Sequence, residues 1–415
     1  MVFIMGFKIG IAGAGQFAQC FVPLFKNHPF VDEVSVAELI PERREKYAAG
    51  FGIAKTYTSL DDMLKNSDVD AVAIFTQRHL HGEHVLQSLK AGKHVYCAVP
   101  MAQTEEEVFD ILDEVKKSGL IYMTGETSYY YPSTVYCRDQ FNAGLIGDFV
   151  YGEAQYVHDM MHGFYDAFRY SGGADWKKVA GIPPMHYPTH STSMILSVTG
   201  AKTTSVSCLG YKDRHMDGVF TEGGNLWDNP FSNESALMRT SDGGMMRINE
   251  FRRAGWSGKN SVYMSLFGTM ATYEEHAASS VWTNIKWGGT KDLTDDMDCK
   301  DHYVSVGNTH EMIAHDFHAT LSKVHHAYRL PQNFGGLPNG HFGSHQFLVD
   351  DFMKSLMTNK LPPNNAWRAA DYVLPGLIAH QSALKNGELL NVPDTGSPPA
   401  SWDLLDADSY VAYRF

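Results

Sequence analysis

A short glycine motif near the N-terminus constrains the fold of this chain more than any other feature. Residues 7–12 form an apolar run that only Lys8 interrupts, which is typical of a parallel strand buried on both faces. The next residues follow the pattern G-x-G-x-x-A, and those expected to meet a cofactor are Gly13, Gly15, Gln16, Phe17 and Ala18. Such glycines permit a tight turn and close approach of the backbone to a pyrophosphate. The motif predicts a dinucleotide-binding turn, with a plain strand–turn–helix corner as the alternative.

Strand and helix patterns alternate from the glycine motif to about residue 125. Apolar runs predict strands at 33–39, 71–76, 93–99 and 120–126. One helix is expected to run from Phe17 past Leu24, and two later ones to begin after the capping residues Ser59 and Thr104. The α/β alternation predicts an N-terminal Rossmann domain, with a doubly wound parallel sheet, over residues 1–125.

After about residue 148 the pattern changes to period-two alternation broken by glycine turns. The alternating stretches lie at 149–160, 203–213, 234–253 and 261–275. They predict a C-terminal α+β domain over residues 126–415, with an open mixed or antiparallel sheet. Further along, we expect loops with one or two short helices at 280–338, amphipathic helices at 344–360 and 365–387, and a surface tail from about residue 391.

Composition limits the classes of function. The length of 415 residues favours two domains, and the formal net charge of −13 argues against nucleic acid as a partner. The five cysteines show no C-x-x-C spacing, so neither a disulfide framework nor a zinc cluster is expected. The apolar N-terminus predicts a buried strand rather than a signal peptide, and no apolar run reaches about 18 residues. We therefore expect a cytoplasmic protein away from membranes, and the open sheet face favours a homo-oligomer.

A carboxylate after the second strand indicates which dinucleotide binds. Glu38 follows Ala18 by 20 residues, where a carboxylate can accept hydrogen bonds from the adenosine ribose. A negative charge there repels a 2′-phosphate, so NAD is expected rather than NADP. Arg43 and Arg44 leave NADP open as the alternative, because their side chains could bind that phosphate.

The stretch TQRHLHGEHVLQSLKAGKHVYCAVP, residues 76–100, resembles the Gfo/Idh/MocA oxidoreductase family. The usual form of that family is T-P-N-x-x-H, then A-G-K-H-V, then E-K-P. Thr76 and His81 keep their places, whereas Ala98 and Val99 replace the glutamate and lysine of the last motif. The resemblance implies a Rossmann half followed by a mixed-sheet half, and it places these four residues beside the cofactor.

The missing lysine bears on the chemistry. In dehydrogenases of that family the lysine hydrogen-bonds the hydroxyl that is oxidised and helps to remove its proton, which Val99 cannot do. The chain is then either a non-catalytic homologue that binds a sugar or a dinucleotide, or an enzyme in which other residues handle the proton.

Candidates for that proton chemistry lie in the second half. Tyr156 and His158 are two apart on a predicted strand, so both side chains leave the same face. Such a pair suits acid–base work where a positive nicotinamide lowers the pKa of the phenol. Plainer roles are a half-buried strand aromatic for Tyr156, a contact to Asp159 for His158, and a helix cap for His190.

These segments also look like glycoside hydrolase family 109, the NAD-dependent α-N-acetylgalactosaminidases. The chain shares the G-E-A-x-Y-x-H-D strand and, in part, the Y-P-T-H-G loop. The resemblance assigns functional positions to Glu126, Tyr156, His158, Tyr187 and His190, and places His341 or His345 of a glycine-rich segment beside the substrate. Three departures are Ala98 for glutamate, Ser191 for glycine, and a shorter connection from Asp159 to Tyr187. The sugar specificity is therefore not carried over.

The chemistry implied is glycoside cleavage by transient oxidation of carbon 3, elimination, addition of water and re-reduction. Tyr156 is the expected carbon-2 base, His190 would handle the carbon-3 hydroxyl with His158 as its partner, and Glu126 and Tyr187 would bind the sugar. An NAD-dependent sugar or cyclitol dehydrogenase is the alternative.

Two further signals have weaker implications. His310 and His315 are five residues apart, so on a helix they diverge and cannot share a metal ion with Glu311, and no metal site is predicted. Arg252 and Arg253 could bind an anionic sugar substituent, although a solvated strand end is the commoner outcome.

Overall fold

The first third of the chain folds around a parallel sheet, as the alternation predicts. The computed structural model describes residues 6–255, 261–276, 278–286, 288–299, 301–303, 317–319, 321–337 and 339–407. The strand order is β3-β2-β1-β4-β5-β6, made by β1 (Phe7–Ala12), β2 (Val31–Ala37), β3 (Thr56–Tyr57), β4 (Ala71–Ile74), β5 (His94–Cys97) and β6 (Tyr122–Thr124). The direction of winding reverses beside β1, and ligands bind such sheets where the carboxyl ends of the strands meet this reversal.

Two of the helices of this domain begin at predicted capping residues. The domain's helices include α2 (Pro41–Phe51), α3 (Leu60–Asn66), α4 (His81–Lys90) and α5 (Glu105–Ser118). The Ser59 hydroxyl accepts from the Asp62 N–H, and the Thr104 hydroxyl accepts from the Glu107 N–H, so both predicted caps are confirmed. Gly119, with φ +70°, ends α5 in the left-handed conformation.

The first helix is shorter than predicted. A 3-10 turn, Ala18–Cys20, follows the glycine motif, and only then does α1 (Val22–Asn27) begin. The single helix predicted from Phe17 is wrong. Pro23 has no N–H, so a continuous helix would lack the bond from that position to the preceding turn, whereas proline is tolerated at a helix start.

The second half contains a nine-stranded open sheet with the order β14-β13-β12-β11-β7-β10-β9-β8-β17. Its strands are β7 (Phe149–Val157), β8 (Thr203–Lys212), β9 (Phe231–Thr240), β10 (Met245–Phe251), β11 (Val262–Gly268), β12 (Ala271–His276), β13 (Ser279–Asn284), β14 (Gly289–Asp292) and β17 (Leu390–Asn391). The pair β7–β10 is parallel and the other pairs are antiparallel, so the predicted open mixed sheet is confirmed.

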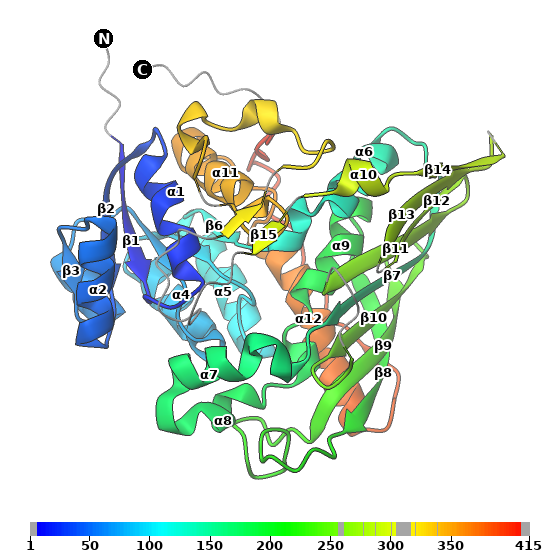
Figure 1. Cartoon of the computed structure of the whole chain (residues 1–415), viewed down its shortest axis with the longest axis horizontal. Helices are drawn as coiled ribbons and strands as arrows, with labels where there is room; N and C mark the ends of the chain where they lie inside the picture. The colour runs from blue at the N-terminus through cyan, green and yellow to red at the C-terminus, as the bar shows by residue number, and fades with distance from the viewer. Residues whose placement is uncertain are drawn as a thin grey trace.

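Helices cover one face of this sheet (Figure 1). They are α6 (Pro132–Asn142), α9 (Thr189–Thr199) and α12 (Ala366–Leu384), whose apolar side chains form one core with β7 to β12. The opposite face carries exposed apolar side chains, among them Leu209 at 65% exposure and Leu237 at 53%. A sheet with one face buried and one open accounts for the period-two pattern.

The two predicted C-terminal helices are confirmed as α11 (Ser344–Thr358) and α12, and nearly all of their side chains are buried, polar ones included. On α11 the side chains of Asp350, Asp351 and Lys354 are fully buried. Lys354 pairs with Asp350 at 2.8 Å, and Arg329 pairs with Asp351 at 2.7 Å. The charges are buried because each has an opposite partner, so the polar stripe did not mark a solvent-facing side.

The segment between β7 and the loop at 183–188 lies against the Rossmann domain. It forms α7 (Tyr165–Gly172) and α8 (Trp176–Ala180), drawn below the N-terminal domain in Figure 1. Arg43 donates to the Tyr170 carbonyl and lies 3.9 Å from the centre of its ring. Gln77 donates to the Ser171 carbonyl at 2.9 Å. The segment therefore bridges the second sheet and the loops that follow β2 and β4.

Two loop predictions need correction. The stretch 280–338 contains β13, β14, the short α10 (Thr294–Met297), and a small sheet of β15 (Asp301–Tyr303) and β16 (Phe317–Ala319). Its edge strand β14 is exposed at all four positions, so no alternation marked it. His310, Glu311 and His315 lie outside the described residues.

The predicted surface tail is docked as far as residue 407. Leu405 is 8% exposed, and its N–H donates to the Leu361 carbonyl at 2.7 Å. Thr395 donates to buried Asp371 at 2.7 Å. These isolated anchors have no periodicity, which is why the composition resembled a free tail.

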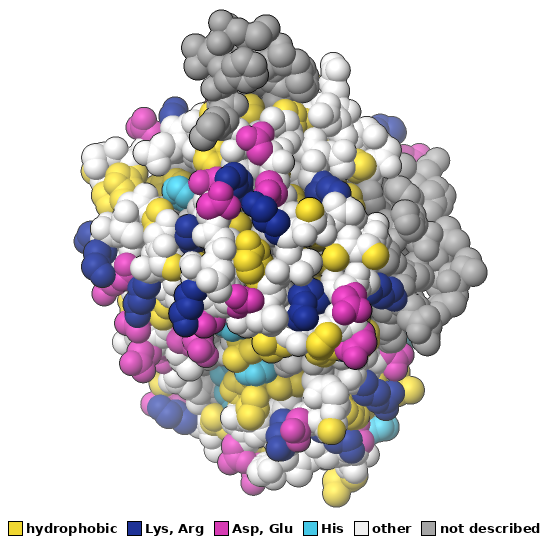
Figure 2. All heavy atoms as spheres, turned by 90° about the vertical axis from the view of Figure 1, so that its left-hand side faces the viewer, with side chains coloured by type: hydrophobic (Ala, Val, Ile, Leu, Met, Phe, Trp, Pro, Cys, Tyr) yellow, Lys and Arg dark blue, Asp and Glu magenta, His cyan; other side chains and the backbone are white. Residues whose placement is uncertain are grey.

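Figure 2 shows the side of the molecule that carries the N-terminal domain, with basic and acidic side chains interspersed and with apolar and histidine side chains together below its middle. In the part of the chain that the structure describes, no helix has the length and apolar character needed to cross a membrane.

Candidate active site

The glycine turn after β1 has the geometry that a pyrophosphate needs. Gly13 has φ +93°, and a Cβ there would lie 2.9 Å from the Phe75 carbonyl oxygen. A Cβ at Gly15 would meet no heavy atom within 4 Å, so open space lies before the turn. Ala18 is fully buried, as the close packing of the motif requires. These residues fit a dinucleotide whose phosphates approach the backbone at Gly15.

Glu38 lies beside this turn. Its carboxylate accepts from the Ala14 N–H at 2.8 Å and from the Ile40 N–H at 2.9 Å, which holds it at the carboxyl end of β2. Arg44 donates to the Glu38 carbonyl at 2.7 Å, and Arg43 is engaged with Tyr170. Both guanidinium groups are thus held by main-chain carbonyls, and the carboxylate remains where it would meet a ribose.

The loops after β4 and β5 are tied together by His81. Its ring nitrogens lie 3.0 Å from the Thr76 carbonyl and 2.7 Å from the Pro100 carbonyl, and burial lowers its pKa to about 4. A neutral imidazole has one N–H, so it donates to one of these carbonyls at a time. Ala98 and Val99 are 7% and 5% exposed. The position of the missing lysine is therefore apolar and closed.

The second half brings a histidine and a glutamate together. His190, at the start of α9, places Nδ1 2.6 Å from Oε1 of Glu126, which follows β6. Glu126 also accepts from the Ser128 N–H at 2.9 Å. Burial alone would raise the pKa of the Glu126 carboxyl, but His190 and the hydrogen bonds it accepts lower it below its ordinary value. Glu126 is therefore an ionised acceptor.

This pairing fixes which tautomer the neutral imidazole adopts. With Nδ1–H donating to Glu126, Nε2 carries the lone pair, and the Tyr187 hydroxyl lies 3.3 Å from it. A carboxylate behind a histidine orients the ring and stabilises the imidazolium that forms when Nε2 takes a proton. The arrangement is therefore one in which a histidine can serve as a general base.

Tyr156 and His158 complete this cluster. Strand β7 ends at Val157, so His158 lies just beyond the strand on which it was predicted. The rings of Tyr156 and His158 are nevertheless 5.6 Å apart. The Tyr156 ring is 5.3 Å from that of His190, and burial raises the pKa of its phenol above the ordinary value. His158 stacks on Phe164 at 3.9 Å, and burial lowers its pKa to about 4, so it is neutral at pH 7.

The glycine-rich segment before α11 joins the two halves of the site. His345 accepts from the Gly340 N–H at 3.3 Å through Nδ1, so its Nε2–H donates to His341 Nδ1 at 2.9 Å. Solvent reaches the His341 ring, yet the surrounding protein removes part of its hydration and lowers its pKa to about 3. The His341 ring lies 5.4 Å from that of Phe17 and 6.5 Å from that of His190. The cofactor turn and the histidine cluster are therefore contiguous.

Sequence reasoning missed two buried carboxylates that hold the loop carrying Tyr187 and His190. Glu250 on β10 accepts from the Ser191 hydroxyl at 2.6 Å, and Glu234 on β9 accepts from the Met185 N–H at 2.8 Å. Burial raises the pKa of Glu250 to about 7, although neighbouring Arg252 opposes the shift. The sequence does carry a signal for Glu250. It lies two residues after the inward-facing Ile248 on the same strand, where alternation favours an apolar side chain.

The two adjacent arginines are neither solvated nor available. Arg252 is 4% exposed and donates to Glu250 at 2.8 Å, and its guanidinium lies 4.6 Å from the centre of the Tyr156 ring. Arg253 donates to Asp217 at 2.6 Å. The expected solvated strand end is therefore wrong, because carboxylates compensate both charges. Sequence reasoning also passed over Arg78, whose guanidinium lies 4.5 Å from the centre of the Tyr187 ring.

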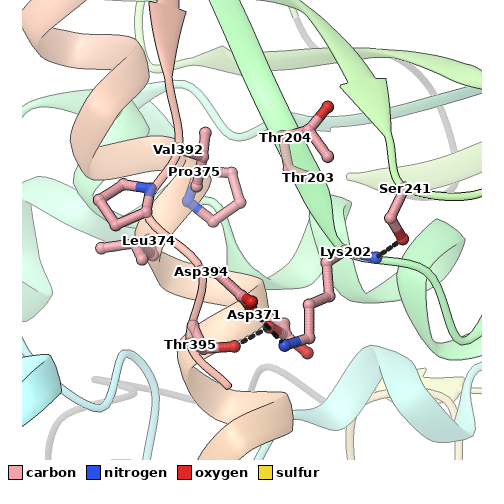
Figure 3. Close-up of a pocket in the computed structure, with 11 residues that line it drawn as sticks. Lys202, Thr203, Thr204, Ser241, Asp371, Leu374, Pro375, Val392, Asp394 and Thr395 are labelled. Carbon is pink, nitrogen blue, oxygen red and sulfur yellow. Dashed lines mark hydrogen bonds and ion pairs between the residues drawn. The ribbon is translucent and has the colours of Figure 1, made fainter. Parts of the chain in front are cut away.

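A cavity of about 390 Å³ lies elsewhere, between β8, α12 and the segment 392–395 (Figure 3). The charged side chains that line this cavity already have partners within the protein. Lys202 pairs with Asp394 at 2.7 Å, and Asp371 accepts a hydrogen bond from Thr395. Among the described residues, no group of three or more histidine, cysteine, aspartate or glutamate side chains could hold a metal ion.

Relatives match both halves of this arrangement. Residues 7–126 match the model of the Gfo/Idh/MocA family, described as an oxidoreductase family with an NAD-binding Rossmann fold. A glycosyl hydrolase family 109 protein of Streptomyces filamentosus is 22% identical over 416 residues, which cover 93% of this chain and 77% of that protein. The trans-1,2-dihydrobenzene-1,2-diol dehydrogenase of Mus musculus is 29% identical over 179 residues, 43% of this chain and 52% of its own length.

Solved structures share the fold over most of the chain. Levoglucosan dehydrogenase in complex with NADH has a TM-score of 0.70 at 16% identity, and the alignment covers 94% of this chain and all of that one (100%). At this identity the likeness concerns the fold alone. The resemblance and the cofactor expected from the sequence are confirmed: residues 7–126 form an NAD-binding Rossmann domain of the Gfo/Idh/MocA oxidoreductase family.

Proposed function

We propose that this protein is an NAD-dependent glycosidase that cleaves its substrate by transient oxidation at carbon 3. The observation that carries the proposal is the Glu126–His190 pair, a general base that replaces the absent lysine at Val99. The similarity to glycosyl hydrolase family 109 proteins over 93% of the chain supports the same assignment.

The turn at Gly13 and Gly15, with Glu38, would hold the dinucleotide. Bound NAD⁺ would supply a reversible hydride acceptor and a positive charge beside the histidine cluster. Gln16, Phe17, Thr76, His81, Ala98 and Val99 are proposed to border it.

The chain's own residues move the protons. Nε2 of His190 takes the proton of the carbon-3 hydroxyl, and Glu126 stabilises the imidazolium across 2.6 Å. The Tyr187 hydroxyl lies 3.3 Å from Nε2, and from there it orients the carbon-3 hydroxyl of the sugar. His158 and His341, both neutral at pH 7, line the sugar, and His345 orients His341.

Tyr156 is the proposed group at carbon 2, whose proton becomes acidic once carbon 3 is a ketone. Burial favours its protonated form, while the nearby Arg252 and Arg78 favour the phenolate. Loss of the carbon-2 proton expels the aglycone from carbon 1, and water then adds to the resulting double bond.

The test is a panel of aryl α- and β-glycosides, neutral and acidic, assayed with and without added NAD⁺. We expect release of the aglycone without net formation of NADH, and exchange of deuterium at carbon 2 with water. Full retention of that deuterium in the released sugar would overturn the mechanism. Stoichiometric NADH with a keto-sugar would establish the alternative, a sugar or cyclitol dehydrogenase, since the same base also suits oxidation of a hydroxyl. NAD binding without either reaction would indicate a non-catalytic binder.

We also propose a cytoplasmic homo-oligomer assembled through the open sheet face, and a domain division at residue 125. Light scattering after size exclusion tests the assembly, with Leu237→Glu as a variant that places a charge on the exposed face.

A further inference from the structure

Arg78 lies between the cofactor loops and the histidine cluster. It begins the 3-10 turn Arg78–Leu80 that follows β4, at the position where the T-P-N motif has asparagine. Its guanidinium carbon lies 4.5, 5.4 and 5.8 Å from the ring centres of Tyr187, Phe168 and Phe164, respectively. Aromatic rings satisfy the flat face of a guanidinium, whereas its N–H groups lie in the plane and need acceptors.

Other arginines around the site have such acceptors. Arg252 is paired with Glu250, Arg253 with Asp217, and Arg43 with the Tyr170 carbonyl. Arg78 hydrogen-bonds to the neutral Tyr187 side chain, but it has no carboxylate within ion-pair distance among the residues that the structure describes. It therefore brings an uncompensated positive charge to the site.

The nearby acidic groups do not compensate it. Glu126 is committed to His190 and Ser128, and Glu250 to Ser191 and Arg252. In a protein with a formal net charge of −13, this leaves one local positive charge flanked by apolar rings. A charge of that kind attracts an anion more strongly than it would in open water.

Tyr187 links this charge to the reacting position. Its ring faces Arg78, and its hydroxyl lies 3.3 Å from the basic nitrogen of His190. A sugar that offers a hydroxyl to His190 therefore lies beside the tyrosine that Arg78 contacts. The planar N–H fork of arginine matches the two oxygens of a carboxylate or of a sulfate or sulfonate group.

We propose that Arg78 binds an oxyanion on the sugar, so that the substrate is an acidic glycoside carrying a carboxylate, a sulfate ester or a sulfonate. This inference rests on the proposed function in placing the sugar against His190. It replaces the earlier candidates Arg252 and Arg253, whose charges are already paired.

The test compares 4-nitrophenyl glucuronides, 6-sulfated glucosides and unsubstituted glucosides, with the galacto series alongside, on the NAD-loaded protein. We expect the wild type to prefer one acidic series. Arg78→Gln should lower kcat/KM for that series by about 10- to 100-fold more than for neutral glycosides, because the loss of its charge near Tyr156 affects both series alike. Arg78→Lys keeps the positive charge but not the planar pair of N–H donors, so its kcat/KM for the acidic series should lie between those of the wild type and Arg78→Gln. Arg169→Gln on α7 is the matched control, since Arg169 is exposed, forms an ion pair with Asp166 and lies over the rings of Tyr165 and Trp176, none of which belongs to the histidine cluster.

Two binding measurements separate the possible failures. Calorimetry with free glucuronate and with glucose 6-sulfate reports anion binding without turnover, so binding that Arg78→Gln abolishes supports the inference even if no glycoside is cleaved. Turnover of neutral glycosides with no preference for acidic ones would overturn it and leave the glycosidase standing. Loss of NAD affinity in Arg78→Gln, with the substrate preference unchanged, would also overturn it and assign Arg78 to the phosphates of the cofactor.

Discussion

The cofactor end and the sugar end of this molecule are built in different ways. At the cofactor end, one strand and one turn supply the motif from Gly13 to Ala18, and Glu38 comes directly after the next strand. At the sugar end, Glu126, Tyr156 and His190 come from three separate elements and are joined by bonds such as the Nδ1–Oε1 contact over 64 positions.

The difference explains why one end keeps its family pattern and the other departs from it. A turn that depends on a glycine conformation has few substitutes, whereas a proton-handling group can be supplied from any element that reaches the substrate. The loss of the lysine at Val99 is therefore compatible with an active enzyme, because the proposed base, His190, belongs to α9 and not to the segment that carries Val99.

The largest effect is expected at the sugar end alone. His190→Ala removes the general base, so turnover should fall by about 10²- to 10⁴-fold while NAD affinity stays as in the wild type. Single-turnover assays and NAD titration measure the two quantities. His276→Ala, at an exposed strand end, is the control. An equal loss of NAD affinity would show that the two ends are not separable.

Glu250, which holds the start of the helix that carries His190, should make the stability of the protein depend on pH. The pKa of Glu250 is raised from 4.5 to about 7, so the folded protein holds a proton that the unfolded chain releases between these values. This contribution to stability is complete below pH 4.5 and lost above pH 7. E250Q leaves Arg252 without its carboxylate, which has a cost of its own, but the difference in free energy of unfolding between E250Q and the wild type should move in favour of E250Q by up to about 3 kcal/mol as the pH rises from 4.5 to above 7.

Denaturant titrations of both proteins from pH 4 to pH 8 test this prediction. A constant difference across that range would mean that Glu250 does not change its protonation on unfolding. Since Ser191 and Arg252 contact the same carboxylate, the activity profile of E250Q should also be flatter than that of the wild type.

At the cofactor end, two glycines allow a matched comparison. Gly13→Ala places a Cβ 2.9 Å from a carbonyl oxygen at φ +93°, so the free energy of unfolding should fall by about 1–3 kcal/mol. Gly15→Ala meets no atom within 4 Å, so stability should change by less than about 0.5 kcal/mol while NAD affinity falls. Equal stability of the two variants in thermal unfolding would contradict the assignment.

The smallest effect concerns the residue that replaces glycine in the loop of family 109. Ser191→Ala removes the bond to Glu250, which should lower the free energy of unfolding by about 1–2 kcal/mol. The effect should shrink in E250Q, because the two side chains are coupled. Ser197→Ala on the same helix is the control, since the buried Ser197 hydroxyl has no hydrogen-bond partner in the described chain.

The parts of the structure that the sequence predicted well depend on near neighbours. The caps at Ser59 and Thr104 act over three residues, the glycine turn over six, and strand alternation over two. The parts that were missed depend on distant partners. Ser191 contacts Glu250 across 59 positions of the sequence, and Arg329 contacts Asp351 across 22. The residue pattern around one partner does not indicate where the other partner lies.

The candidate site shows the same division. The identities of Glu126, Tyr156 and His190 followed from their motifs, but the proton positions followed only from the contacts of each nitrogen. Arg78 was visible as a departure from T-P-N, and its meaning depended on three rings from other parts of the chain.

The placement of α11 and α12 also bears on how the chain is made. Side chains of α11 share a core with one face of the Rossmann sheet, and those of α12 with the other face. During synthesis from the N-terminus, the helices of the first domain thus cover only part of each apolar face until residues 344–384 leave the ribosome. A fragment that ends near residue 125 would keep the phosphate-binding turn but lack these coverings, and would be prone to aggregate.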